Sequence, residues 1–327
     1  MLVPARDEEP YLEEALQSLV EQSFEDFEVI VVDDGSTDAT AEIAQAFVAA
    51  DRRFRLLRQE PRGVVAAAER ARAAARGAYI ACMDGDDRAR PQRLQLQLEA
   101  LEREELVACG VSVSYFSDDV VRDGLRRYER WLNSLSTPEA AARDVFVESP
   151  IANPTLLARR TALEAVGGYR TTPWPEDYDL ILRLWAAGGR FRNLEPVLHD
   201  WRDHPERLSR TSERYSVEAF ARCKVHHLRR TIVRAGTAVV VWGAGPVGKM
   251  FARELLRAGV EVAGFVEVDP RKLGKTIYGI PVRSADDPAP RAAVALGAVA
   301  GAAARERLRE LARAQGRVEG VDFVAVA

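Results

Sequence analysis

The chain has 327 residues, of which 29% are charged and 47% are hydrophobic, and its formal net charge is −4. This length suits two globular domains, and the composition excludes extensive disorder. The charge balance gives no electrostatic reason to expect a nucleic-acid partner.

The three cysteines, Cys82, Cys109 and Cys223, lie far apart and lack C-x-x-C spacing. The sequence therefore predicts neither a disulfide framework nor a zinc site. It also contains no apolar run of about 18 residues that could cross a membrane, and no signal-peptide core at its start. We expect a cytoplasmic protein, with peripheral attachment to the inner face of a membrane and oligomerisation both left open.

The first part of the chain alternates short apolar runs with helical patterns, which is typical of a mostly parallel sheet covered by helices. The segment between residues 106 and 150 mixes strand-like and irregular helical patterns, and residues 199–216 are polar and turn-like. We predict an α/β fold in which the strands are residues 1–4, 27–32, 54–59 and 78–84, and the helices are residues 9–22, 41–48, 64–77, 91–105 and one starting near Glu176.

Carboxylates follow two of these strands at their C-terminal ends. Asp33 and Asp34 follow the second strand, and Asp84, Asp86 and Asp87 follow the fourth. Ligands of open α/β sheets bind in the crevice outside the carboxyl ends of the strands. The sequence therefore predicts that these side chains converge on one edge of the sheet.

Two interpretations of the segment Asp84-Gly85-Asp86-Asp87 compete. Aspartates are favoured in the cap and first turn of a helix, and Pro91 suits a helix start. That interpretation does not explain Asp84, or the aspartate pair after the second strand. The alternative is a hard divalent cation, Mg²⁺ or Mn²⁺, which one or two carboxylates hold and which also binds water and a diphosphate. The spacing alone leaves both open.

Five short segments occur along the chain in a fixed order. They are VPARDEE, VVDDGSTDAT, GAYIACMDGDD followed by Pro91 and Arg93-Leu94, VGGY, and EDYDLILRL. In this order and spacing they resemble family 2 glycosyltransferases of the GT-A fold, over roughly Met1 to Ser212. The resemblance implies a mixed, mostly parallel sheet with helices on both faces. It also implies an inverting transfer of a sugar from a nucleotide-sugar donor.

The resemblance assigns nucleotide and metal roles to particular positions. Asp34 would accept a hydrogen bond from the base, taken as uracil. Asp84 and Asp86 correspond to the family's D-x-D motif at the diphosphate, with Asp86 favoured as the direct metal ligand. The floor under the base and its surroundings would comprise Pro4, Ala5, Arg6 and Glu8.

Two further positions gain a role only through the resemblance. Asp177, with its neighbour Glu176, lies where the family keeps its catalytic base, although the pair alone is more typical of an acidic first helical turn. His204 alone is typical of a surface or turn histidine. Because the family often has Arg-x-His near this point, Arg202 and His204 become candidates for contact with the diphosphate or the metal.

The chain departs from the family pattern at two places. Arg6-Asp7 stands where the family often shows Tyr-Asn, so stacking on the base is lost or is replaced by a guanidinium. Residues 67–71 read AAERA where the family often has Ala-Arg-Asn-x-Gly, so an arginine and an asparagine that help at the nucleotide are missing. Both departures leave donor identity open.

A new strand, glycine turn and helix begin near residue 231, so we expect a glycosyltransferase domain with a helical linker at 1–230 and a second domain at 231–327. VVVWGAGPVGK supplies Gly243, Gly245 and Gly248, and Glu267 follows about 20 residues on, as in a dinucleotide fingerprint. The region resembles Rossmann-like domains that bind nucleotides or sugars in sugar-modifying enzymes. These four residues are candidate ligand contacts, unless the glycines serve only tight packing in a structural or oligomerisation domain.

The combined patterns predict a metal-dependent, inverting glycosyltransferase that uses a nucleotide sugar, expected to be a UDP-sugar. Its acceptor would be a hydroxyl group of a glycan, a lipid-linked sugar or a surface polysaccharide. One alternative is a catalytically silent scaffold that binds a nucleotide sugar, which the altered Arg6-Asp7 pair motivates. The other is an NAD-dependent oxidoreductase using the second domain, for which the sequence offers no acid-base partner.

Overall fold

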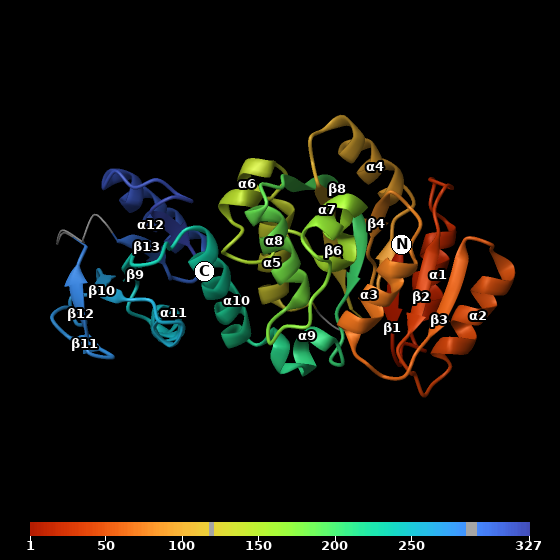
Figure 1. Cartoon of the computed structure of the whole chain (residues 1–327), viewed down its shortest axis with the longest axis horizontal. Coiled ribbons are helices and arrows are strands. Elements are labelled where there is room, and N and C mark those ends of the chain that lie inside the picture. The colour runs from red at the N-terminus through yellow and green to blue at the C-terminus, as the bar shows by residue number, and fades with distance from the viewer. Residues whose placement is uncertain (118–120, 286–292) are drawn as a thin grey trace. The chain divides into compact units, whose positions relative to one another are not determined.

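The computed structural model describes residues 1–117, 121–285 and 293–327 (Figure 1). It divides into two compact units, of which the first comprises residues 1–142, 150–172 and 179–211 and the second comprises residues 143–149, 173–178 and 212–327. The expected division lay at residue 230. Helix α10 (Val217–Thr231), which we expected as a linker of the first domain, instead belongs to the second unit, where it packs against α11 (Pro246–Arg257).

The first unit holds two sheets and the helices around them. The strands are β1 (Leu2–Ala5), β2 (Val29–Asp33), β3 (Phe54–Arg58), β4 (Tyr79–Ala81), β5 (Arg88–Ala89), β6 (Ala108–Phe116), β7 (Leu157–Arg159) and β8 (Phe191–Arg202). The helices are α1 (Leu12–Val20), α2 (Thr40–Ala50), α3 (Val64–Ala74), α4 (Arg93–Arg103), α5 (Asp123–Asn133), α6 (Pro138–Arg143), α7 (Arg160–Ala165), α8 (Glu176–Ala186), whose first three residues belong to the second unit, and α9 (Leu208–Thr211).

The two sheets of the first unit meet next to the acidic segment. Strands β1, β2 and β3 form a parallel sheet in that order, and the other five form a mixed sheet of order β4-β7-β6-β8-β5. A parallel bridge between Leu2 and Cys82 joins them, and the backbone N–H of Met83 donates to the Leu2 carbonyl at 3.1 Å. The segment 84–87 therefore leaves the sheet directly beside the C-terminal end of β1.

Alternating residues of β1 and β2 form the core of the parallel sheet. Val3, Val29 and Val31 are fully buried and belong to one cluster with Leu12 and Leu16 of α1. Residues between them face the other side, where α3 packs against β1 and β2. The continuous apolar run of β2 reflects this burial on both faces.

The second unit contains α10, a six-stranded sheet and two further helices. Its sheet order is β11-β12-β10-β9-β13-β14, and all pairs are parallel except β11 with β12. In chain order the parallel strands run 3-2-1-4-5, which is the order of a nucleotide-binding α/β sheet. The elements are β9 (Val239–Trp242), α11, β10 (Val262–Glu267), β11 (Thr276–Ile277), β12 (Ile280–Ser284), β13 (Val294–Gly297), α12 (Ala302–Ala314) and β14 (Phe323–Ala325), drawn in blue tones in Figure 1.

The three glycines of the motif, Gly243, Gly245 and Gly248, meet different constraints. Gly243 has φ +109°, a backbone conformation that side chains disfavour, and a Cβ on Gly248 would lie 1.8 Å from the Gly243 carbonyl oxygen. Gly245 has φ −84°, and a Cβ there would meet nothing within 4 Å. Packing therefore requires glycine at 243 and 248 but not at 245.

The sequence patterns predicted most early elements to within a few residues. They failed at residues 199–216, because β8 continues through His199 to Arg202 and pairs with β6 and β5. In the part of the chain that the structure describes, no helix is both long enough and apolar enough to span a bilayer.

We predict that Gly248→Ala destabilises the second unit, because the new methyl group would overlap the Gly243 carbonyl. Overpacking of this kind costs about 1–3 kcal/mol, and each kcal/mol lowers the melting temperature by roughly 4 °C in a domain of this size. Gly245→Ala is the matched control and should stay within about 0.5 kcal/mol of the parent. Calorimetric melting of both variants would reveal an error in this packing if they behaved alike.

Candidate functional site

The acidic segment lies in the loop between β4 and β5. Carboxylate oxygens of Asp84, Asp86 and Asp87 lie within 4.8 Å of one another. Helix α4 begins only at Arg93, after β5, and its N-cap residue is Gln92. The helix-cap interpretation of the aspartates is therefore wrong, because a strand separates them from the helix.

Asp87 is the fully buried member of the three. One of its oxygens accepts from the backbone N–H of Arg202 at 2.8 Å, and the other lies 3.0 Å from His199 Nε2. Burial and the nearby Asp86 raise the pKa of the Asp87 carboxyl. Both oxygens are thus committed to β8, which makes Asp87 a structural anchor rather than a free ligand.

The anchor continues through a buried arginine. Arg93 Nη1 lies 3.3 Å from His199 Nδ1, and its other nitrogens donate to the Cys82 carbonyl at 2.8 Å and to Gln97 at 3.1 Å. A guanidinium can only donate, so Nδ1 accepts and the ring proton sits on Nε2, facing Asp87. Burial and Arg93 lower the pKa of His199, which keeps the ring neutral, while burial lowers the pKa of Arg93 only to about 10.

Asp86 instead faces the segment after β8. His204 Nε2 lies 2.8 Å from Asp86 Oδ2, and Nδ1 lies 3.3 Å from Glu206. The hydrogen bond to Asp86 raises the pKa of His204. Two of the predicted metal ligands, which are 118 positions apart in the chain, therefore lie side by side.

Glu8 closes the same site from the loop after β1. A Cβ on Gly85 would lie 3.3 Å from the Glu8 side chain and 3.6 Å from Ala5. Burial, with Asp86 and Asp84 nearby, raises the pKa of Glu8 to about 8. Glycine between the two aspartates therefore allows the β1–α1 loop to pack on the acidic segment.

Three side chains in this region could hold a divalent cation. Asp84 and Asp86 offer carboxylate oxygens within 4.8 Å of each other, and His204 adds an imidazole nitrogen next to Asp86. Mg²⁺ or Mn²⁺ that also binds water and a diphosphate needs only a small number of protein ligands, most of them oxygen atoms. Asp84, Asp86 and His204 fit such an ion. Asp87 is not included, because each of its oxygens already accepts a hydrogen bond from β8.

Arg202 has contacts other than those expected from its sequence position. It is 7% exposed, its Nε donates to the Asp86 carbonyl at 2.8 Å, and its Nη2 pairs with Glu14. Arg207, which the sequence reasoning missed, lies with its guanidinium 4.9 Å from the Trp201 ring and in the field of the three aspartates. An arginine three residues after a candidate histidine gave no distinct sequence signal among the many arginines of the chain.

The candidate base-binding residues are held by hydrogen bonds among the loops that follow β1, β2 and β3. Asp34 is buried and accepts from Gln59 Nε2 at 2.6 Å and from the backbone N–H groups of Arg62 and Gly63 at 2.8 and 2.7 Å. Asp7 adopts φ +54° and accepts from the Thr37 backbone N–H at 2.8 Å. Three more hydrogen bonds join the same two loops, those after β1 and β2: the backbone N–H groups of Asp7, Glu8 and Glu9 donate to the side chains of Ser36, Thr40 and Asp38.

Both departures from the family pattern have a structural role here. Asp7 holds the two loops together, and the exposed Arg6 lies 3.5 Å from it. Glu69 accepts from the Tyr169 backbone N–H at 2.6 Å and pairs with Arg72, which seats the VGGY turn on α3. The nucleotide roles of Pro4, Ala5 and Arg6 stay predictions, with their backbone at the C-terminal end of β1.

Glu176 and Asp177 belong to the second unit. The Glu176 carboxylate accepts from Tyr215 Oη at 2.7 Å and from Arg214 at 3.3 Å. Asp177 accepts from the backbone N–H of Tyr178 at 2.8 Å, as the second residue of α8. Glu176 is therefore engaged in holding the segment after α9, and the catalytic role of Asp177 stays a prediction.

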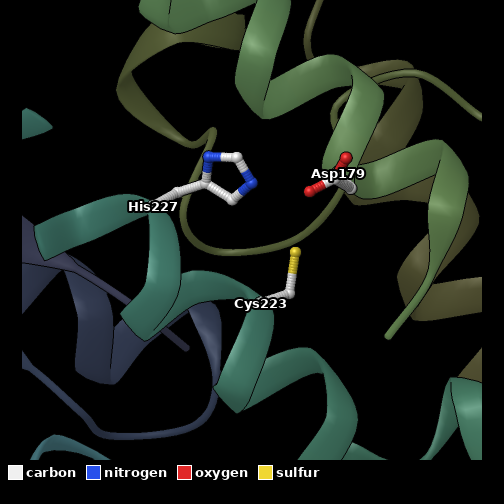
Figure 2. Close-up of side chains that lie close together, drawn as sticks. All are labelled: Asp179, Cys223 and His227. Carbon is white, nitrogen blue, oxygen red and sulfur yellow. The ribbon is translucent and has the colours of Figure 1, made fainter. Parts of the chain in front are cut away.

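Helix α10 carries a histidine and a cysteine of the kinds that bind metals. Cys223 and His227 stand one turn apart on the helix and leave it on the same side (Figure 2). Asp179, drawn in the same figure, belongs to the first unit. Two ligand atoms from one helix do not complete a metal site, so we assign none there.

Glu267 lies at the C-terminal end of β10, beside the glycine loop. One oxygen accepts from the Ala244 backbone N–H at 3.1 Å and from Lys272 Nζ at 2.8 Å. The other accepts from the backbone N–H groups of Val268 and Asp269 at 2.9 and 3.2 Å. A carboxylate has about four acceptor positions, and all four are occupied within the protein.

Comparison with known proteins places this geometry in context. The model of the family described as Glycosyl transferase family 2 matches residues 1–167, more than half of the chain. The chain is 32% identical over 215 residues to the putative glycosyltransferase EpsE of Bacillus subtilis (strain 168), covering 63% of this chain and 73% of EpsE. It is 34% identical over 208 residues to chondroitin synthase of Escherichia coli, covering 63% of this chain and 29% of that protein.

A solved structure supports the fold. S. aureus TarS, residues 1–349 in complex with UDP-GlcNAc, superposes with a TM-score of 0.57 at 19% identity, covering 69% of this chain and 65% of that chain. The chain thus spans slightly less than two thirds of that structure and under a third of the chondroitin synthase. At this identity the likeness shows a GT-A-like fold.

We predict that Arg93→Met destabilises the first unit by about 3–5 kcal/mol, since removing one partner leaves buried polar groups of Asp87, His199 and Cys82 without their cation. The matched control is Arg90→Met, because Arg90 is 44% exposed and pairs with Asp200 at the surface. That variant should change stability by less than about 1 kcal/mol. Urea unfolding followed by tryptophan fluorescence measures both, and equal losses would contradict the anchor.

We also predict that the metal-free first unit loses stability as pH rises. The folded state holds the Glu8 proton up to about pH 8, whereas the unfolded state releases it near its model value of 4.5, so this contribution is lost between those values. His204 has a raised folded pKa, so its contribution is lost as pH rises from 6.5 through that pKa. Melting in EDTA should show this decline, and Glu8→Gln should flatten it. His199, whose pKa is lowered, acts in the opposite sense below pH 6.5, so the difference between the parent and Glu8→Gln is the readout. A difference that does not fall as pH rises would contradict the Glu8 assignment.

Proposed function

Because the chain belongs to glycosyl transferase family 2, we propose that it transfers a sugar with inversion from a UDP-sugar to a hydroxyl group of a growing surface polysaccharide or related glycan. The observation that carries the proposal is the gathering of Asp84, Asp86 and His204 beside the end of β1, on the edge of the sheet that also holds Asp34. This edge is where nucleotides bind in open α/β sheets.

Asp84, Asp86 and His204 are proposed to hold Mg²⁺ or Mn²⁺ at the donor diphosphate. The bound ion would stabilise the negative charge that develops on the departing nucleoside diphosphate. Asp86 and His204 already lie 2.8 Å apart, so a bound cation would replace the proton that now lies between them. Glu8 lies against the same segment, and the burial and neighbouring carboxylates that raise its pKa are an electrostatic cost that a bound cation would offset.

The hydrogen bonds of Asp34 favour uracil over guanine. In the described part of the chain, three of the roughly four acceptor positions of this carboxylate are used by Gln59, Arg62 and Gly63. One position on Oδ2 is left, which suits the single N3–H of uracil. Guanine presents two adjacent N–H donors and would need a second free position. The TarS complex with UDP-GlcNAc is consistent with this choice.

The cation for the diphosphate is proposed to be Arg207 in place of Arg202. Arg202 already donates its Nε to the Asp86 carbonyl and its Nη2 to the Glu14 carboxylate. Arg207 lies over Trp201 in the field of the same aspartates, so its charge suits an anion bound at the metal. This assignment moves the role from the last residue of β8 to the segment between β8 and α9.

Asp177 is proposed as the base that removes the proton of the acceptor hydroxyl, with Glu176 as its neighbour that organises the segment through Tyr215 and Arg214. Attack of the resulting alkoxide-like oxygen on the anomeric carbon displaces the diphosphate and inverts the configuration. The relative named as chondroitin synthase supports a polysaccharide acceptor.

The glycine loop of the second unit is proposed to bind a nucleotide or sugar-phosphate group at Gly243, Gly245 and Gly248. The open space at Gly245 and the start of α11 support this, because a helix N-terminus favours an anion. The NAD-dependent alternative needs Glu267 for the ribose, and its four acceptor positions are already occupied. We therefore do not propose a dehydrogenase.

The test uses two substitutions with different expected results. Asp86→Asn should abolish Mn²⁺-dependent stabilisation by UDP, which for the parent at about 100 times the dissociation constant is roughly 2.7 kcal/mol. Asp177→Asn should retain this stabilisation and lose sugar transfer or donor hydrolysis by about 10²–10⁴-fold. Thermal melting with UDP, GDP or NAD, with and without Mn²⁺, and UDP release from a panel of UDP-sugars measure these effects.

Other outcomes would point elsewhere. UDP stabilisation that needs no Mn²⁺ and survives in Asp86→Asn would remove the metal role. Full transfer by Asp177→Asn would remove its role as the base. A parent that binds UDP with Mn²⁺ but turns over no UDP-sugar would favour the silent scaffold, and a response to NAD alone would move the chemistry to the second unit.

A further inference from the structure

A column of ring and guanidinium groups in contact leads to His204. Arg88 and Arg202 both place their guanidinium carbons over the Phe116 ring, at 4.0 and 4.4 Å from its centroid. Arg202 also lies 4.7 Å from the Tyr11 ring, and the Tyr11 ring lies 4.9 Å from the His204 ring. Planar groups in contact at these distances restrict one another's rotation.

Hydrogen bonds hold the column at its arginines. Glu14 of α1 accepts from Arg88 Nη1 at 2.8 Å and also from Arg202 Nη2. Arg202 donates its Nε to the Asp86 carbonyl, and its backbone N–H to Asp87, each at 2.8 Å. The same residue therefore fixes the backbone of Asp86 and supports the ring that packs on His204.

Neither Tyr11 nor Arg202 needs to touch an ion to affect it. The imidazole of His204 packs against the Tyr11 ring, and its Nε2 lies within hydrogen-bond distance of Asp86. If the Tyr11 ring is removed, the imidazole can rotate away from Asp86. If Arg202 is replaced by lysine, the planar group that stacks between Tyr11 and Phe116 is lost although the charge remains.

We propose that Tyr11 and Arg202 are positioning residues, which set the His204 imidazole and the Asp86 carboxylate in the arrangement that binds the divalent cation. The inference rests on the proposed metal role of Asp86 and His204. Residues that orient metal ligands from outside typically change metal affinity by 10–100-fold when they are replaced. The column thus links Glu14 of α1 to the metal site, and Arg202 serves the diphosphate only through it.

The experiment measures Mn²⁺ binding directly, by the electron paramagnetic resonance signal of free Mn²⁺ in titrations of the full chain with saturating UDP. Tyr11→Leu and Arg202→Lys should each weaken Mn²⁺ binding by about 10–100-fold. Tyr11→Phe keeps the ring and should restore binding to within about threefold of the parent. Arg90→Lys is the control for an arginine outside the column, because the half-exposed Arg90 side chain pairs with Asp200, and this variant should bind Mn²⁺ like the parent.

Asp86→Asn in the same titration separates failure of this inference from failure of the proposed function. Loss of Mn²⁺ binding in Asp86→Asn, with parent-like binding in Tyr11→Leu, overturns the positioning role and leaves the metal role standing. Parent-like binding in Asp86→Asn overturns the metal role itself. If Arg202→Lys does not fold by circular dichroism, the pair Tyr11→Leu and Tyr11→Phe decides, and equal weakening in both overturns the role of the ring.

Discussion

Asp87 is a buried carboxylate whose two oxygens are both bound to β8, one by a backbone N–H and one by His199. A carboxylate in the interior is costly unless hydrogen bonds and a cation compensate it. Arg93 supplies that cation through the histidine and also holds the Cys82 carbonyl, next to the join between the two sheets. The acidic loop, the end of β8 and the start of α4 are therefore fixed to one another by a single chain of polar contacts.

This anchor explains why three nearby aspartates differ in their chemistry. Asp87 is fully buried and accepts two hydrogen bonds from β8, whereas Asp86 faces His204 after the end of that strand. The same turn brings β8 beside β5, which carries Arg202 to the Asp86 backbone and His204 to its side chain. A structural carboxylate thus positions two functional ones.

The altered family positions show a similar division of work. Asp7 ties the β1–α1 loop to the β2–α2 loop, and Glu69 seats the VGGY turn on α3. Each keeps the pocket in shape through hydrogen bonds within the protein. In the second unit Glu267 does the same for the glycine loop, because all its acceptor positions are filled by Lys272 and backbone N–H groups. A residue at a motif position can therefore be structural even where the motif is functional.

The sequence by itself determined the early strands and helices, the order of the motifs and the set of acidic residues at the sheet edge, because these follow from local periodicity and short-range spacing. Only the tertiary structure decided which aspartate is an anchor, which arginine supports the site and that His199 takes part at all. Those assignments depend on the pairing of β5 with β8, between residues more than 100 positions apart, and on burial. Neighbouring aspartates and scattered arginines are chemically alike in a sequence, and their surroundings alone separate their roles.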